Sequence, residues 1–303
     1  METQKRIISV IAVPVLLIAA GIIIYQTISK KWNLDYAIAG TMVFTLAYLF
    51  LLEIVIPLKV NWVGTRSEIR SDATYFGLAI VLSALGQLAA LSLMLHLHDW
   101  FEMETGFWDD LPFFAVFVLA NLIGEFIPYW YHRVSHIANQ RSWFSMFLWR
   151  LHAIHHIPPK MNQLKTNWMH PANMFLNVFT KIFPLQFLGF DKEVIFAVGV
   201  TNLVVAYLSH ANIQARTGIL DYLLATPRVH HFHHSAKLEE AKNYANILPF
   251  WDLLFGTYFN NGKAVTKVGV SEEDTAQYPA LNRIWKHMQF PFSNKVESEI
   301  PAE

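Results

Sequence analysis

The sequence contains no cysteine among its 303 residues. Disulfide bonds, thiolate chemistry and iron–sulfur clusters held by this chain are therefore excluded, and cysteine usage says nothing about the redox compartment. Charged residues are also scarce, since they make up 15% of the chain, against about a quarter in soluble domains. Lys+Arg and Asp+Glu are equal at 23 each, so the chain has no charge bias that would predict a nucleic-acid partner.

Apolar residues make up 54% of the chain and gather in long runs. A helix that crosses the roughly 30 Å core of a bilayer needs about 20 consecutive apolar residues. Four segments meet this requirement: Ile7–Ile28, Tyr36–Leu58, Tyr75–Leu95 and Leu111–Tyr131. Two shorter segments, Ala172–Leu188 and Val194–Leu208, could cross as a hairpin, enter partway or pack inside the protein. The sequence therefore predicts an all-α integral membrane protein with four transmembrane helices, or six if both shorter segments cross.

The charges of the connecting loops predict the orientation. Lys59, Arg66 and Arg70 follow the second segment, whereas residues 96–110 hold five acidic residues and no Lys or Arg. Because positive loops stay on the cytoplasmic side, the end of the fourth segment, where the first histidines lie, should face the cytoplasm. Lys30 and Lys31 argue against this assignment, since they would face outward.

We expect three parts along the chain. Residues 1–110 should hold N-terminal transmembrane helices, residues 111–260 a catalytic domain whose helical cap lies on the cytoplasmic side, and residues 261–303 a polar tail. In the tail, Tyr278–Phe292 mixes aromatic and basic residues. This segment suits a helix at the membrane interface or, equally, a surface helix packed on its own domain.

Histidine is the unusual residue, with 14 copies, most of them in three short clusters. Residues three and four apart stand on one face of a helix, so an i, i+4 pair can hold one ion. A triad at i, i+3 and i+4 can contribute to two adjacent ions. The spacing predicts eight metal ligands: His132, His136, His152, His155, His156, His230, His233 and His234.

The number and type of these ligands favour a two-metal centre. A catalytic zinc takes about three protein ligands, and Arg133 follows His132 where a zinc protease would carry its glutamate. Imidazole suits iron, and attack of O2 on an unactivated C–H bond requires a redox centre. The alternative is a histidine-rich membrane protein that binds or transports zinc or nickel. Transport would spread ionisable residues through several spans, whereas most of the clusters follow the spans.

The remaining histidines are assigned one by one. His210 ends an apolar segment and could be a ninth ligand, or simply an interfacial residue at a helix end. His170 could fill either role, and His231 lies off the metal-facing side of its cluster. His96, His98 and His287 look incidental.

Glu125 lies seven residues before His132, two helical turns away on the same face, within an apolar stretch. We expect it to support catalysis by fixing the tautomer of a ligand. The alternative is a buried glutamate with a structural role.

These motifs resemble the fatty acid hydroxylase/sterol desaturase superfamily of membrane di-iron enzymes, over about residues 121–258. The resemblance rests on the histidine clusters, on Asn243-Tyr244 and on Trp251-Asp252. Ala245 departs from it, since that family commonly has glycine there. The resemblance implies an O2-dependent oxidase that hydroxylates or desaturates a membrane lipid: a sterol, a sphingoid or fatty acyl chain, or an alkylglycerol.

The resemblance also implies two iron ions and an external source of electrons. We expect no fused cytochrome domain, because the chain has no room for one outside its membrane helices. A separate donor, similar to cytochrome b5, ferredoxin or rubredoxin and paired with a reductase, should then reduce the centre.

Overall fold

The computed structural model describes residues 2–62, 64–101, 106–137, 142–271 and 275–293. These residues form helices and no strand, with isolated bridges from Pro57 to Ile213 and from Ser235 to Val268. The α-helices are α1 (Glu2–Ser29), α2 (Leu34–Val55), α3 (Arg66–Phe101), α4 (Phe113–His136), α5 (Trp143–His156), α6 (Pro171–Phe187), α7 (Lys192–His210), α8 (Leu220–Leu223), α9 (Pro227–His233), α10 (Phe250–Leu254) and α11 (Ile284–Gln289). Short 3₁₀ turns cover Val60–Trp62, Gln163–Asn167, Thr275–Gln277 and Phe290–Phe292. The all-α prediction is confirmed.

Among the described residues, five helices are long and apolar enough to cross a membrane: α1, α2, α3, α4 and α7. The four strong segments of the sequence are all present, and α7 adds a fifth. Helix α6 has 17 residues, or about 25 Å at 1.5 Å per residue, which is short for a full crossing.

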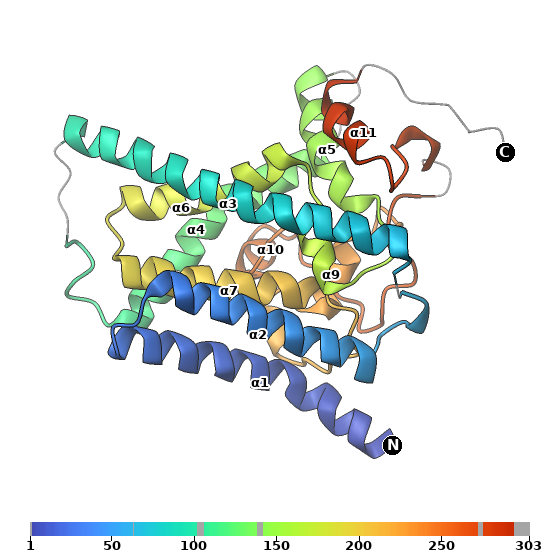
Figure 1. The fold of residues 1–303 in the computed structure, drawn as a ribbon, viewed down its shortest axis with the longest axis horizontal. Coiled ribbons are helices and arrows are strands. Elements are labelled where there is room, and N and C mark those ends of the chain that lie inside the picture. Colours follow the sequence, from blue (N-terminus) through green and yellow to red (C-terminus); the bar gives the residue numbers. More distant parts are fainter. Residues whose placement is uncertain (1, 63, 102–105, 138–141, 272–274, 294–303) are drawn as a thin grey trace.

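Helices α6 and α7 form a hairpin, a shape that fits each of the three alternatives for this region. The turn between them includes Gly189 at a φ of 71°, in the left-handed region that glycine enters without strain. His170 caps the start of α6, and His210 is the last residue of α7. The chain therefore leaves one end of the bundle and returns to the same end (Figure 1).

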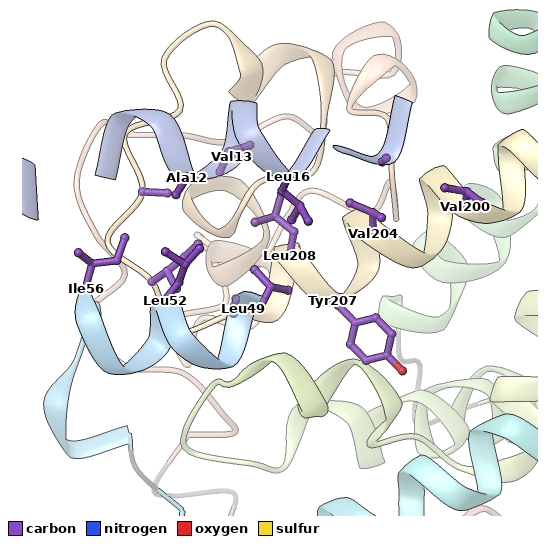
Figure 2. Close-up of a cluster of buried hydrophobic side chains, with 14 of the residues drawn as sticks. Ala12, Val13, Leu16, Leu49, Leu52, Ile56, Val200, Val204, Tyr207 and Leu208 are labelled. Carbon is purple, nitrogen blue, oxygen red and sulfur yellow. The ribbon is translucent and has the colours of Figure 1, made fainter. Parts of the chain in front are cut away.

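The helices pack through narrow apolar seams while their outer faces stay exposed. Leu16 of α1, Leu49 of α2 and Leu208 of α7 are fully buried in one cluster (Figure 2). On the outside, Ile18 and Leu88 are 62% and 61% exposed. Exposed apolar faces on helices of this length fit contact with lipid. Packing of α1 and α2 on α7, and of α3 on α6, also crosses the expected domain boundary near residue 110.

Helices α3 and α6 approach each other closely. A Cβ atom at Gly86 would lie 3.2 Å from the carbonyl oxygen of Phe175 and from Cβ of Val178. Small residues at such crossings let helices pack in a membrane, where burial of apolar surface gives no driving force.

The residues after α7 cover one end of the bundle with short helices (Figure 1). Within the predicted tail helix, only α11 and the 3₁₀ turn after it are helical. His287 of α11 is fully buried, and its Nδ1 lies 2.6 Å from the hydroxyl of Tyr75. Trp285 points outward and is 72% exposed. The segment thus packs on its own domain through His287 and leaves an aromatic side chain exposed.

Candidate metal centre

Nine histidines from four helices converge at the end of the bundle where α4 and α7 finish. Helix α4 contributes two, α5 three, α7 one, and α9 with its C-cap three. His136 is half-buried and the other eight are buried. They are the nine predicted ligands: His132, His136, His152, His155, His156, His210, His230, His233 and His234.

The nine rings divide into two adjacent groups. The first group holds His132, His136, His152, His156 and His233. The second group holds His155, His210, His230 and His234. Within each group the candidate ligand atoms lie within 4.8 Å of one another. The two groups are in contact, because the rings of His156 in the first group and His234 in the second stack with centroids 4.5 Å apart.

Helical spacing explains how each triad serves both groups. In α5, His152 and His156 are four residues apart and join the first group, whereas His155, at i+3, joins the second. The cluster of α9 is divided in the opposite sense, with His233 as the residue that crosses to the first group. A residue at i+3 lies beside the i, i+4 row and not within it. The geometry expected of the repeated His-x-x-His-His spacing is therefore present.

Backbone carbonyls orient several of the rings. Nδ1 of His132 lies 2.6 Å from the carbonyl oxygen of Tyr244, and Nδ1 of His155 lies 3.0 Å from that of Trp168. The Nδ1 atoms of His210 and His233 face carbonyl oxygens at 2.9 Å. A carbonyl oxygen only accepts, so each Nδ1 carries the proton and each Nε2 keeps a lone pair.

These lone pairs point at one another, which is the strongest local evidence that the residues fit metal ions. The Nε2 atoms of His155 and His210 lie 3.1 Å apart, although the carbonyl contacts leave both as acceptors. Nε2 of His233 is buried without a hydrogen-bond partner. Facing acceptors in a buried site need a cation between them.

The charge state of the rings also suits a metal. Burial lowers the pKa of His155 to about 4, against the smaller opposing effect of its hydrogen bond to Trp168. Burial likewise holds the pKa of the other histidines of α5 and of the α9 cluster well below the usual value: His152, His156, His230, His233 and His234. Neutral imidazoles are the form that binds metal ions without first losing a proton.

Asp252 of α10 holds the loop after α9 that supports the first group. The carboxylate of Asp252 accepts hydrogen bonds from the backbone N–H groups of Tyr244 and Ala245, at 2.8 and 2.9 Å, and from the Thr257 hydroxyl at 2.6 Å. The carbonyl of Tyr244 in turn orients His132. Ala245 has a negative φ, so the alanine at this position causes no backbone strain.

Glu125 contacts the same loop and not a histidine. Its Oε2 accepts hydrogen bonds from the backbone N–H groups of Asn246 and Ile247, at 3.2 and 3.0 Å. Its Oε1 forms an ion pair with Lys181 of α6. Glu125 is 1% exposed. Glu125 therefore acts on His132 only through the backbone of the 244–247 loop. The sequence had led us to expect a direct contact between the carboxylate and a ligand ring.

The other histidines lie outside both groups. His170 caps α6, because its Nδ1 accepts from the N–H of Ala172 at 3.1 Å. His231 packs its ring against Trp62, with centroids 5.6 Å apart. His96 and His287 also belong to neither group. The side chain of His98 lies outside the described residues.

A cavity of about 520 Å³ leads from the histidines into the membrane-spanning part of the protein. Five of the rings line its inner end: His132, His152, His155, His210 and His230. Its walls come from α2, α3, α6 and α7, and they include Met42, Phe76, Val178 and Leu203. The arrangement can bring an alkyl chain against the candidate metal site.

Three supporting residues were not singled out by our sequence analysis. Asp252 and Asn243 appeared there only within motifs. Asn243 adopts a φ of 61°, and its side chain bonds the carbonyls of Val229 and Phe259 at 3.0 and 2.8 Å. Lys181 is a single charge inside an apolar segment, which is itself a signal of function in a membrane helix.

Comparison with known proteins places these features in a family. The fatty acid hydroxylase family profile matches residues 117–257. Ornithine lipid hydroxylase OlsE of Rhizobium tropici is 28% identical over 263 residues, which cover 84% of this chain and 76% of that protein. Alkylglycerol monooxygenase of Homo sapiens is 27% identical over 260 residues, covering 78% of this chain and 53% of that protein.

The Danio rerio alkylglycerol monooxygenase is 31% identical over 217 residues, covering 69% of this chain and 45% of that protein. The chain thus spans about half the length of these monooxygenases. No solved structure gives a significant match.

Proposed function

Because this chain belongs to the fatty acid hydroxylase superfamily, as its histidine motifs predict, we propose that it is a di-iron membrane enzyme that hydroxylates a lipid with O2. The observation that carries the proposal is the convergence of nine imidazoles in two adjacent groups at the inner end of a mostly apolar cavity.

Each set of residues would have a separate role. The first group of five histidines would hold one iron and the second group of four the other. Bound iron supplies the redox chemistry that activates O2, which no side chain of this protein can supply. Tyr244 and Trp168 hold their partner rings in the ligating tautomer. Asp252 and Glu125 fix the loop that carries Tyr244. The cavity orients the lipid and keeps water away from the reacting carbon.

The relatives favour hydroxylation over desaturation. The two kinds of relative are named as an ornithine lipid hydroxylase and an alkylglycerol monooxygenase. An ornithine lipid and an alkylglycerol share an apolar tail and a polar head, which the mixed walls of the cavity would accept. Desaturation of an acyl chain is the second outcome that the same centre could give.

We propose that the histidines face the cytoplasm and receive electrons from a separate donor similar to cytochrome b5, ferredoxin or rubredoxin. The loop that carries Lys59 bonds the loop after His210, through the N–H of Lys59 and Oδ1 of Asn212 at 2.9 Å. The basic loop and the histidines therefore lie at the same end of the bundle, and positive loops favour the cytoplasmic side.

The alternative of a zinc or nickel transporter has less support. A transport path would carry ligands along the spans, whereas the described histidine groups gather at one end of them. Nine imidazoles in contact also exceed the four ligands of a closed zinc site.

The test combines metal analysis with lipid analysis. Protein reconstituted anaerobically with Fe(II) should bind two ions, and with a chemical reductant and ¹⁸O₂ it should add one labelled oxygen to a lipid of its host membrane. His233→Ala should lose one ion and the activity. His170→Asn is the matched control, because it removes a histidine outside both groups and keeps the helix cap. One ion per chain that survives His233→Ala would refute the two-metal proposal.

A further inference from the structure

Lys181 of α6 lies between the candidate membrane spans α4 and α7, and it lines the cavity. Its side chain is 13% exposed, forms an ion pair with Glu125 and donates to Oδ1 of Asn202 on α7. A charged group at this depth is costly, so those that occur mark substrate or ion sites. Lys181, Glu125 and Asn202 form a polar cluster whose cavity side has no role in metal binding.

The position of the cluster can be measured along three independent helices. On α4, Glu125 precedes His132 by seven residues; on α7, Asn202 precedes His210 by eight. On α6, Lys181 follows Asn173 by eight residues, and Asn173 contacts Nδ1 of His152 at 3.2 Å. At 1.5 Å per residue, all three place the cluster roughly 10–12 Å from the histidines.

The hydrogen-bond groups of the cluster define what it can bind. An ammonium has three N–H donors, and in Lys181 two of them serve Glu125 and Asn202. The amide of Asn202 donates one N–H to the carbonyl of Val198 at 2.7 Å, which leaves its second N–H. The charges of Lys181 and Glu125 cancel. The site therefore offers donors without net charge, which suits a neutral acceptor oxygen better than a phosphate or carboxylate.

We infer that the lipid oxidised by this protein carries a neutral acceptor oxygen, such as an ester or amide carbonyl or a hydroxyl, that binds Lys181 and Asn202. This inference rests on the proposed function. The cluster then sets the position of hydroxylation, at roughly 10–12 Å, or about eight to ten bonds of an extended chain, from that oxygen. Ile38, Phe76 and Leu203 supply apolar walls for the chain between the two points.

The experiment locates the new oxygen in the product. Full-length protein loaded with iron is incubated with its host membrane lipids, reductant and ¹⁸O₂, and tandem mass spectrometry maps the labelled position. Asn202→Leu removes a donor while it keeps the ion pair, and Lys181→Gln removes the ammonium. Each should raise the KM for the lipid about tenfold, the usual effect of one hydrogen bond, spread the label over neighbouring carbons and leave iron content unchanged.

Thr201→Val is the matched control on α7, because the Thr201 hydroxyl bonds its own helix at the carbonyl of Ala197, 2.9 Å away. Unchanged KM and label position in both Asn202→Leu and Lys181→Gln, with an active wild-type protein, overturn this inference alone. A second result would also overturn it: a wild-type product whose unlabelled oxygens all lie within about four bonds of the labelled carbon. Such a span falls well short of the roughly 10–12 Å between the cluster and the histidines. A wild-type protein that binds iron but labels no lipid overturns the proposed function as well.

Discussion

Replacement of Asp252 by asparagine should weaken one metal position and spare the other. Asp252 accepts three hydrogen bonds, two of them from the backbone that presents the carbonyl of Tyr244 to His132. An asparagine has a single acceptor oxygen, so at least one backbone N–H would face an amide N–H. The loop should then shift and release the ring of His132.

The size of the effect follows from the contact that is lost. A hydrogen bond to a charged group contributes about 1.5–3 kcal/mol. Transmitted fully to His132, this corresponds to about 10–150-fold weaker binding at the first group. The second group contains neither His132 nor another ring bonded to this loop by a described contact, so its affinity should stay within about threefold, the additivity expected of independent sites.

Anaerobic equilibrium dialysis against Fe(II), followed by metal analysis, measures the two affinities. Asp191→Asn is the matched control, since Asp191 caps α7 at the far end of the bundle without a side-chain hydrogen bond to it. Equal weakening of both ions in Asp252→Asn, or unchanged binding of both, would refute the role given to this loop. Normal thermal stability of the variant would show that the change is local.

Three further predictions use other parts of the molecule. Glu125→Gln should keep the fold and lower metal retention or turnover about 10–100-fold, because its hydrogen bonds to the 244–247 loop weaken; unchanged values would make Glu125 purely structural. In membrane vesicles, single cysteines replacing Lys237 and Lys192 should react with impermeant reagents from opposite sides, the first from the cytoplasm; labelling from one side would contradict the topology. Gly86→Leu should lower the melting temperature by several degrees, as an overpacked contact costs about 1–3 kcal/mol. Gly77→Leu on the same helix should not, since a Cβ there meets nothing within 4 Å; equal effects would exclude the close α3–α6 crossing as the cause.

Much of the site could be predicted because its signals are local in the sequence. The spacing of His152, His155 and His156 fixes which rings share a face of one helix, whatever surrounds that helix. His210 has no such neighbour, and its place depended on the return of α7 to the end from which α6 starts. The sequence left the depth of this hairpin open among three alternatives, because a mostly apolar segment of 17 residues neither requires a crossing nor excludes one.

The role of Glu125 also depended on a contact that the sequence does not reveal. Helical periodicity correctly placed it on the face of α4 that carries His132, but periodicity gives no information about a loop more than a hundred residues later. The loop at 244–247 fills the space between the two residues, so the carboxylate bonds Asn246 and Ile247. Lys181 was missed for the same reason, since its partners Glu125 and Asn202 lie on other helices. Asp252 bonds residues near it in the sequence, but its effect on His132 depends on the contact of Tyr244 with α4.

The sequence alone determined that this is a helical membrane protein with clustered imidazoles, because hydropathy and helical spacing act within a single segment. Only the tertiary structure decided how those imidazoles divide into groups of five and four, which carbonyls set their tautomers and where the cavity runs. These properties depend on distances of a few ångströms between side chains on different helices. Such distances are fixed by packing, at Gly86 and in the α6–α7 hairpin among other places, and packing is a property of the whole fold.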